Sequence, residues 1–212
     1  RIAANAPLGD GQELIGGDAM VPAGLDRLVN HLARGIDIRL GQVVREIQNT
    51  PKGVRVLTAT GEVLESQLVC CTVPLGVLKR GAIRFDPPLP AAKTEAIRRL
   101  GMGVLDKIVL LFPRRFWDAI VASALRQLQR CYPKRSIPEP SAALLTRWGE
   151  DPFTYGSYSY PAVGSAPAMR ERLGQRWHGL TFAGEAVNTR FPSTLQGAYL
   201  SGIEAAQQLL AG

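Results

Sequence analysis

Apolar residues near the start of the chain recur three and four positions apart, the spacing that places them on one face of a helix. The pattern ends at Gly35, and glycine commonly stops a helix. The apolar positions that carry it are Leu25, Leu28, Val29 and Leu32. The sequence therefore predicts a helix from Pro22 to Gly35.

Short runs rich in β-branched residues follow, separated by glycines and turn-forming residues. The strands expected from them span residues 36–40, 43–47, 54–60 and 63–73. A turn at 49–53 joins the second run to the third, which predicts a hairpin. The end of the last run, from Leu68 to Val73, is apolar on both faces, as is typical of a strand buried between two layers.

The middle of the chain alternates between irregular and regular segments. Consecutive prolines at 87 and 88 remove donors and favour extended backbone, so residues 85–90 are expected to be irregular. The elements expected after them are a helix at 91–100, a strand at 104–112, a helix at 119–132 and a strand at 143–148. The first of these strands carries one lysine, Lys107, in an otherwise apolar run.

A short strand at 180–183 precedes a final helix that runs from a cap at Ser193 or Thr194 to Leu210. Small residues recur at helical spacing on this helix. They are Gly197, Ala198, Ser201, Gly202, Ala205 and Ala206. Such a face permits close approach of either a neighbouring element or a ligand, and the spacing alone favours neither.

Apolar residues make up 46% of the 212 residues, which suffices for a buried core and excludes a disordered chain. The net charge of +7 is spread over scattered arginines. The densest basic cluster, at residues 79–84, lacks the interleaved aromatic side chains that stack on bases, so nucleic-acid binding is not expected. No apolar run reaches the roughly 18 residues that span a bilayer, so we expect no membrane span.

The three cysteines are Cys70, Cys71 and Cys131. Their odd number and their spacing, which suits no metal site, predict buried free thiols. Unpaired thiols favour a reducing compartment, so a cytoplasmic location is the expectation.

The stretch LTFAGEAVNTRFPSTLQGAYLSG at 180–202 resembles the C-terminal flavin signature of the amine oxidase family. Further matches precede it in the family's order. They are GDAMVPAGL at 17–25, TVPLGVL at 72–78, FDPPLP at 85–90, Lys107 with FW at 116–117, and RW at 147–148 with DP at 151–152 and GSYSY at 156–160. Six ordered matches make the chain similar to flavin-dependent amine oxidases of the polyamine oxidase and lysine demethylase type.

The resemblance implies an α/β (α+β) fold with part of a Rossmann-like FAD domain of the glutathione reductase type and part of a mixed-sheet substrate domain. Residues 1–79 and 166–212 would belong to the FAD domain, and residues 80–165 to the substrate domain. The family's Gly-x-Gly-x-x-Gly turn, which holds the FAD pyrophosphate, is absent from the sequence. Several tens of family residues also have no counterpart near 118–119. We therefore expect a fragment of a longer protein, or a chain from which segments are missing.

The resemblance also assigns cofactor contacts. The carboxylate of Glu185 would accept a hydrogen bond from a ribityl hydroxyl, and Thr194 with Leu195 would begin the helix whose N-terminus faces the flavin ring. Val44 would contact the adenine end. Each residue has a plain structural alternative: a salt bridge or cap for Glu185, an N-cap for Thr194, and core packing for Val44.

In the same family the residue that matches Lys107 holds a water against flavin N5, and a desolvated lysine there could serve proton transfer. Its alternative is a surface lysine on an edge strand. Trp148 and Tyr158 match aromatic positions that wall the space in front of the flavin. Monoamine oxidases pair the second of these with another tyrosine, but the sequence has Thr194 at that position, which favours the polyamine oxidase or demethylase type.

The function implied by the resemblance is oxidation of an amine: hydride passes to the flavin, water hydrolyses the imine, and O2 reoxidises the flavin to give hydrogen peroxide. The expected ligands are FAD, a small-molecule amine and O2, with no metal. Open strand edges also predict association with a second copy or with a complementing chain segment. The alternative is a non-catalytic remnant or interaction module that keeps the scaffold without FAD.

Overall fold

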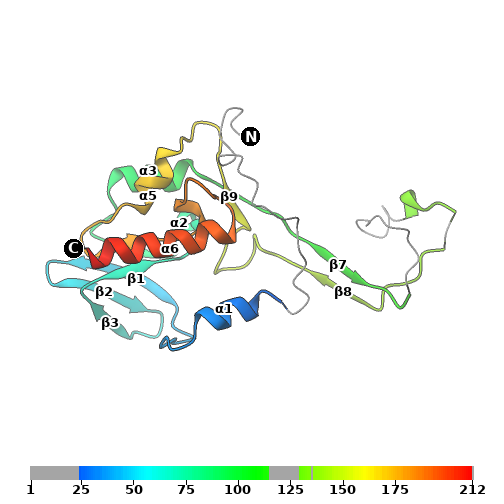
Figure 1. Ribbon diagram of the computed structural model, residues 1–212, viewed down its shortest axis with the longest axis horizontal. Helices are drawn as coiled ribbons and strands as arrows, with labels where there is room; N and C mark the ends of the chain where they lie inside the picture. The colour runs from blue at the N-terminus through cyan, green and yellow to red at the C-terminus, as the bar shows by residue number, and fades with distance from the viewer. Residues whose placement is uncertain (1–23, 115–128, 135, 212) are drawn as a thin grey trace.

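The computed structural model describes residues 24–114, 129–134 and 136–211. Figure 1 shows a body of sheets and helices, from which an arm made of β7 (Ile108–Leu111) and β8 (Ala142–Leu145) extends. Within those ranges no helix is both long enough and apolar enough to cross a membrane. The mixture of helices with parallel and antiparallel strands agrees with the α/β class expected from the sequence.

A four-stranded sheet forms one side of the body, in the order β3-β2-β1-β5. Its strands are β1 (Val44–Thr50), β2 (Gly53–Thr58), β3 (Val63–Ser66) and β5 (Arg84–Asp86). The first three are antiparallel neighbours, which confirms the predicted hairpin, while β5 pairs with β1 in parallel. Gly53 closes the hairpin at a φ of 131°, where a side chain would also meet the carbonyl of Ser66.

Two strand predictions near this sheet are wrong. Residues 36–40 form no strand, and their apolar side chains are exposed, Leu40 by 87%. An alternating pattern stabilises a strand only where a neighbour pairs with it, and no strand of the described residues does so here. The run at 63–73 is interrupted because the Ser66 hydroxyl bonds both the N–H and the C=O of Leu68, which competes with strand pairing.

The second half of that run becomes β4 (Val69–Cys71), which pairs in parallel with β10 (Leu180–Phe182). Cys71 is buried but Cys70 is exposed, so the expectation of a strand buried on both faces is wrong. All three cysteines are free, yet Cys131 is exposed as well, which corrects the prediction of buried thiols. The core beneath β4 and β10 comprises Ile47, Val54, Cys71, Val77, Ile83, Leu180 and Phe182.

Three short helices build a second core beside the first. They are α2 (Leu75–Arg80), α3 (Ala91–Arg99) and α5 (Ala168–Gly174). The sequence predicted α3 but neither of the other two. The residues buried between them are Leu75, Ala96, Leu100, Leu173 and Ala186.

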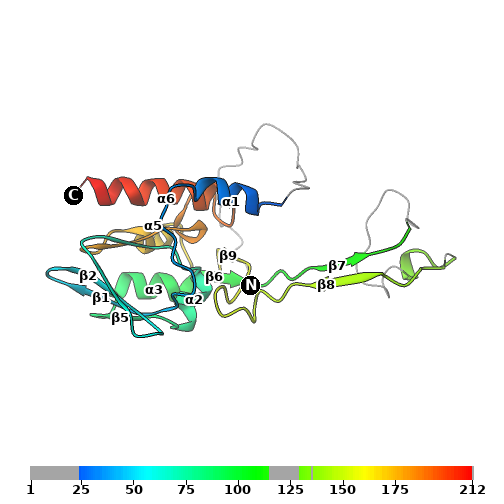
Figure 2. The ribbon, with the colours of Figure 1, turned by 90° about the horizontal axis from the view of Figure 1, so that it is seen from below.

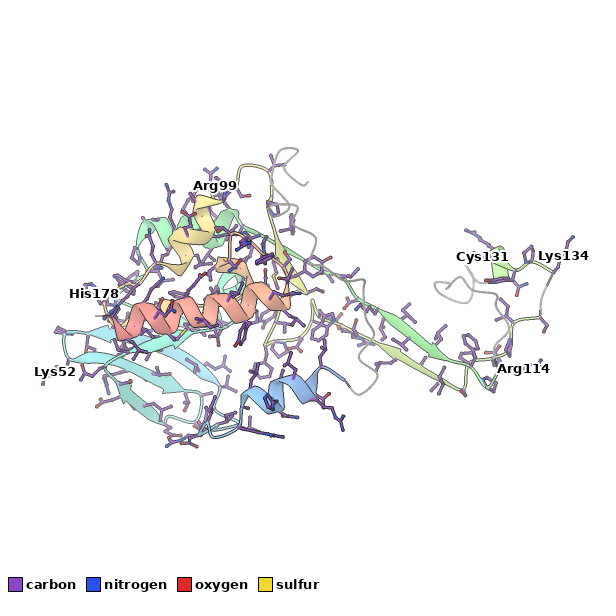
Figure 3. All side chains as sticks on the ribbon, in the orientation of Figure 1. Lys52, Arg99, Arg114, Cys131, Lys134 and His178 are labelled. Atoms are coloured by element: carbon purple, nitrogen blue, oxygen red, sulfur yellow. The ribbon has the colours of Figure 1, made fainter. Side chains whose placement is uncertain are left out.

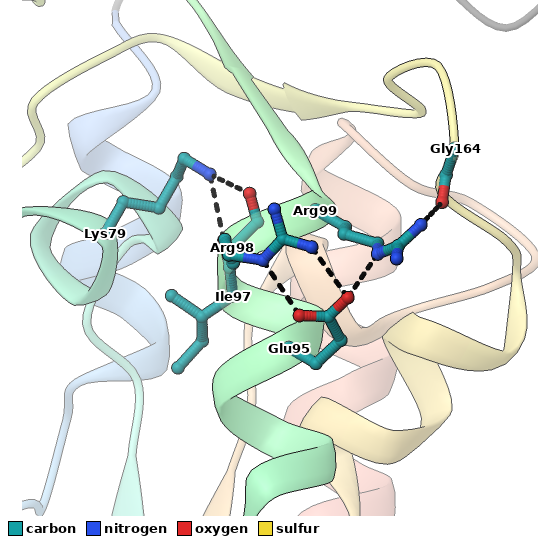
Figure 4. A network of polar contacts seen from close by, with 6 residues as sticks. All are labelled: Lys79, Glu95, Ile97, Arg98, Arg99 and Gly164. Atoms are coloured by element: carbon teal, nitrogen blue, oxygen red, sulfur yellow. Dashed lines mark hydrogen bonds and ion pairs between the residues drawn. The ribbon is translucent and has the colours of Figure 1, made fainter.

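Lysines tie these helices together by bonding the carbonyls that helix ends leave free. Lys79 donates to the carbonyls of Ile97, Arg98 and Leu100 at the end of α3. Figure 4 shows part of this contact beside Glu95, whose bonds from Arg98 and Arg99 lower its pKa to about 2.

Lys93, which is 3% exposed, makes the equivalent contact at the end of α5, with the carbonyls of Arg172, Leu173 and Gln175. Burial lowers the pKa of Lys93 to about 8. The three helices are therefore linked in series by two lysine side chains.

The chain leaves the body through β6 (Gly101–Gly103), which pairs with β9 (Tyr158–Tyr160). The strand expected at 104–112 is shorter, since only β7 forms, and Lys107 lies in the connection before it. Large apolar side chains of the arm are exposed on both strands. Figure 3 labels Arg114 and Cys131 at the far end of the arm. Most of the helix expected at 119–132 lies outside the described residues.

Helix α6 (Leu195–Leu210) begins after Thr194 as predicted, and Figure 2 shows it on the same side of the body as α1 (Asp26–Leu32). Helix α1 confirms the first helix expected from the sequence, but it buries no residue. Strand β5 lies beyond the domain boundary expected at 79–80 and yet shares a sheet with β1. The boundaries themselves remain predictions.

Candidate functional site

The candidate site lies where the parallel strands β4 and β10 end. The carboxyl ends of parallel strands meet at one edge of a sheet, and ligands commonly bind there. Thr72 to Pro74 follow β4, and Ala183 to Glu185 follow β10. A cavity of 230 Å³ lies between these two segments. Its wall also includes Leu78, Met102, Gly156 and Ala198.

Gly184 lines the cavity at this edge and, having no side chain, leaves the space beside it open. Its φ is 139°, and a side chain placed on it would meet no atom within 4 Å. Both its N–H and its C=O bond the hydroxyl of Ser201 on α6, at 2.9 Å each. The small residue thus leaves open space while α6 holds its backbone in place, and Gly202 on the same helix also faces open space.

The carboxylate of Glu185 lines the cavity and is held by two serines. Oε1 accepts from the N–H of Ser159 at 2.9 Å, and Oε2 accepts from the Ser159 hydroxyl at 2.6 Å. Oε2 also accepts from the N–H of Ser193 at 2.8 Å. An ionised carboxylate has about four acceptor positions, so these three bonds leave capacity for a donor in the cavity.

Arg170 contacts Ser159 and is itself buried, with 4% of its surface exposed. Its Nη1 donates to the hydroxyl of Ser159 at 2.7 Å and to the carbonyl of Ala186 at 2.9 Å. Burial lowers the pKa of Arg170, while the charge of Glu185 acts in the opposite direction. Arg170, Ser159 and Glu185 are therefore connected in series by hydrogen bonds, and Glu185 is the member that lines the cavity.

Helix α6 starts beside the same carboxylate. The hydroxyl of Thr194 accepts from the N–H of Gly197 at 3.0 Å, so the side chain is an N-cap, as its plain alternative had it. Gly197 is small because a side chain there would strike the carbonyl of Phe191. Thr194 and Leu195 are exposed. Close packing therefore explains Gly197, whereas a side chain at Gly202 would meet no atom within 4 Å, so packing does not explain Gly202.

Strand β9 brings the aromatic position Tyr158 next to Glu185. Ser159 is fully buried toward the carboxylate, and since strand residues alternate in direction, Tyr158 points to the other face, where it is 39% exposed. Tyr160 packs its ring over Gly101, where no side chain would fit. Tyr160 thus has a packing role, and Tyr158 keeps a free surface.

Lys107 and Trp148 are brought together at the base of the arm. Asp106 accepts from the N–H of Trp148 at 2.8 Å and from the hydroxyl of Thr146 at 3.2 Å, and that hydroxyl accepts from the N–H of Lys107 at 2.7 Å. Lys107 is exposed, which corrects the expected burial. The connection that carries it runs outside the body, where no described residue covers it.

Val44 lies apart from the other candidates. It sits at the start of β1, half-buried against the first core. Of the candidate residues, Glu185 lines the cavity. Thr194 and Leu195 follow Ser193, which bonds Glu185, and Tyr158 precedes Ser159 on β9. Lys107 lies with Trp148 near the arm.

The residues present fit part of a flavin dinucleotide. Small-molecule sites have volumes of about 300–1,000 Å³, so a cavity of 230 Å³ suits one portion of FAD and not the whole. The sequence predictions missed the segment 72–74, Ser159 and Arg170. The first could have been found, because a motif directly after a buried strand belongs at the strand edge. The two others could not, since their contacts span 26 and 11 residues of chain.

The family model of flavin containing amine oxidoreductases matches the chain at residues 5–120 and 118–210. A protein of Oryza sativa subsp. japonica named Lysine-specific histone demethylase 1 homolog 1 is 38% identical over 259 residues, covering 95% of this chain. Polyamine oxidase 2 of Arabidopsis thaliana is 34% identical over 247 residues, covering 93% of this chain.

The chain spans only part of these relatives, 30% of the rice protein and 50% of the Arabidopsis protein. The match nevertheless extends over nearly all of its own length. The chain belongs to the family of flavin containing amine oxidoreductases.

Proposed function

We propose that the protein oxidises an amine with FAD as its cofactor. The observation that carries the proposal is the carboxylate of Glu185, which lines the cavity at the ends of β4 and β10 with acceptor capacity to spare. When bound, FAD would take a hydride from the carbon next to a neutral amine nitrogen and return the electrons to O2 as hydrogen peroxide.

The chain's own residues bind and orient in this proposal. Glu185 accepts a hydrogen bond from a ribityl hydroxyl, and the first turn of α6 turns its free N–H groups toward the ring edge, where they favour negative charge. Trp148 and Tyr158 supply flat surfaces that exclude water and guide the amine. Lys107 holds a water for proton transfer, and Val44 contacts the adenine end.

We also propose that the chain contains only part of the catalytic unit. The alignment with the rice relative has 259 positions although it covers only 95% of the 212 residues of this chain, so more than 47 positions of the alignment have no counterpart here. The two segments of the family match meet at residues 118–120. Both observations support a segment near 118–119 that is shorter here than in the relatives, within the region assigned to the substrate domain.

The amine class is a proposal drawn from the names of the relatives. One is named a polyamine oxidase and another a lysine-specific histone demethylase. Both names refer to amines on flexible aliphatic chains, and Thr194 in place of a second tyrosine agrees with that class. The substrates to test are therefore spermine and a peptide with methylated lysine.

The test is anaerobic mixing of FAD-loaded protein with each amine. Loss of the oxidised flavin absorption, followed by release of hydrogen peroxide when O2 is admitted, supports the proposal. A flavin spectrum that no amine changes contradicts the proposal. Protein that takes up no flavin favours the alternative, a non-catalytic remnant or interaction module that keeps the scaffold without FAD. That alternative is kept because the sequence contains no Gly-x-Gly-x-x-Gly turn for the pyrophosphate.

A further inference from the structure

Arg170 is a buried cation that none of the residue roles described above uses. Burying a charge is costly unless it is paired and hydrogen-bonded. Arg170 makes two bonds, to Ser159 and to Ala186, and its Nη2 is buried with no hydrogen-bond partner among the described residues. A side chain kept in so unfavourable a place needs a compensating role.

We propose that Arg170 is a positioning residue that fixes the carboxylate of Glu185 for flavin binding, acting through the hydroxyl of Ser159. The proposal rests on the proposed function. A serine hydroxyl has one proton and can donate only once. Because Arg170 donates to this oxygen, the single proton of Ser159 is directed to Glu185, 2.6 Å away.

The positive charge of Arg170 also acts on the carboxylate itself. Only one hydroxyl separates the guanidinium from Glu185, and both lie in a partly dry environment where charges interact strongly. An arginine keeps its proton under all ordinary conditions. Arg170 therefore keeps a positive charge one hydroxyl away from the carboxylate, whose position it helps to fix.

The second bond of Arg170 also fixes the backbone that follows Glu185. Nη1 bonds the carbonyl of Ala186, in the short 3-10 helix Glu185–Val187 that carries the carboxylate. On the other side, Ser193 donates its N–H to Glu185 and its hydroxyl to the carbonyl of Ser159. The carboxylate is thus fixed from α5, from β9 and from the start of α6.

The test compares Arg170→Met with Arg172→Met, the same change at an exposed position of the same helix. The first readout is hydrogen exchange, followed by mass spectrometry, at the amides of Ser159 and Ser193, which donate to Glu185. We expect exchange there to quicken at least ~10-fold in Arg170→Met and to stay unchanged in Arg172→Met. Unchanged exchange in Arg170→Met overturns the proposal, whatever the flavin does.

The second readout is the dissociation constant for added FAD, from quenching of flavin fluorescence. We expect Arg170→Met to raise it about 10-fold and Arg170→Lys, which keeps the charge and one donor, to raise it less than about 3-fold. In a Glu185→Gln background, the change at Arg170 should add less than about 3-fold, because the two residues act as one unit. If the effects of the Arg170 and Glu185 changes on the dissociation constant for FAD add in full, Arg170 acts independently of Glu185, and the proposal is overturned.

Two outcomes separate this proposal from the proposed function. If the unaltered chain shows no saturable FAD binding, the proposed function fails and the flavin role of Arg170 falls with it, while the exchange data still decide whether Arg170 orders the carboxylate. If Arg170→Met does not fold, Ser159→Ala cuts the same connection and leaves the guanidinium. Both readouts then apply to that variant with the same expected results.

Discussion

The hydroxyl of Ser159 lies 2.6 Å from the carboxylate of Glu185, although 26 residues separate them in the chain. This bond joins β9, which belongs to the region assigned to the substrate domain, to the flavin signature at the C-terminus. The aromatic position Tyr158 is thereby held at a fixed place relative to the cavity. One carboxylate can thus serve the cofactor and also align the two parts of the site.

Replacing Glu185 by alanine is expected to weaken FAD binding at least about 10-fold, because the ribityl hydroxyl loses its charged acceptor. Titration of the variant and the unaltered chain with FAD measures the effect. Glu171→Ala on α5 is the control, since that carboxylate is exposed. Equal affinities for the Glu185 variant and the unaltered chain would show that the carboxylate has only the structural role of holding Ser159 and Ser193.

Replacing Lys107 by methionine is expected to slow flavin reduction or reoxidation at least about 10-fold, which corresponds to about 1.4 kcal/mol of transition-state stabilisation. The side chain is exposed, so the midpoint of thermal unfolding should not change. Stopped-flow measurement of both half-reactions in FAD-loaded protein tests the prediction. If both rates are retained, Lys107 is a surface lysine.

Replacing Lys93 by methionine is expected to destabilise the fold by about 1–3 kcal/mol, because the carbonyls at the end of α5 lose their donor. Lys52, labelled in Figure 3, is an exposed lysine in a turn, and Lys52→Met is the control. Urea unfolding at pH 7 gives both values. If Lys93→Met lowers the free energy of unfolding no more than Lys52→Met does, the bonds from Lys93 to the end of α5 contribute nothing to stability.

The same lysine makes stability depend on pH. Its pKa is about 8 in the folded chain and 10.5 for the free group, so above pH 8 the unfolded state binds more protons. The free energy of unfolding should therefore rise between pH 7 and 9, by an amount on the order of 1 kcal/mol. The range stops at 9 because Cys71, whose pKa burial raises to about 11, acts in the opposite direction above it. A rise of equal size in Lys93→Met would exclude Lys93 as its source.

The apolar faces of α1 and of the arm are expected to make the chain self-associate. Leu28 and Val29 on α1, and Val109 and Leu144 on the arm, are each at least half exposed, and burial of such apolar side chains favours association. Light scattering after gel filtration should show more monomer in Leu28→Lys with Val109→Lys. Thr60→Lys, an exposed change elsewhere, is the control. A monomeric unaltered chain would refute this expectation.

Local patterns predicted much of the fold. The spacing of apolar residues gave α1, α3 and α6, and the β-branched runs around the 49–53 turn gave β1 and β2. The strand at 36–40 failed because pairing depends on a neighbour that local sequence does not specify. Helix α2, with six residues, is too short for periodicity to reveal, and no helix was predicted at α5.

The residues of the candidate site were also predicted only in part. The family signature led to Glu185 and Thr194, and the structure places Glu185 at the cavity and Thr194 one residue after Ser193, which bonds that carboxylate. The sequence could not reveal that Ser159 and Arg170 stand behind Glu185, because these contacts arise only when β9 and α5 pack against the C-terminal segment. The resemblance implied a desolvated Lys107, but the connection before β7 that carries this residue is exposed, which agrees with the alternative of a surface lysine.

The proposed function implies that this chain provides the ring and ribityl part of an FAD site without the part that holds the pyrophosphate. Titration of the purified chain with FAD and with FMN tests it most directly, by quenching of flavin fluorescence. The chain should purify without flavin and bind both weakly, with dissociation constants of roughly 10 μM to 1 mM. The two values should agree within about 5-fold, since neither ligand gains a pyrophosphate contact and the contact of one half-buried valine, Val44, with adenine adds little to the affinity for FAD. Absence of saturation with either flavin, or FAD that copurifies in equal amount with the chain, would contradict the account.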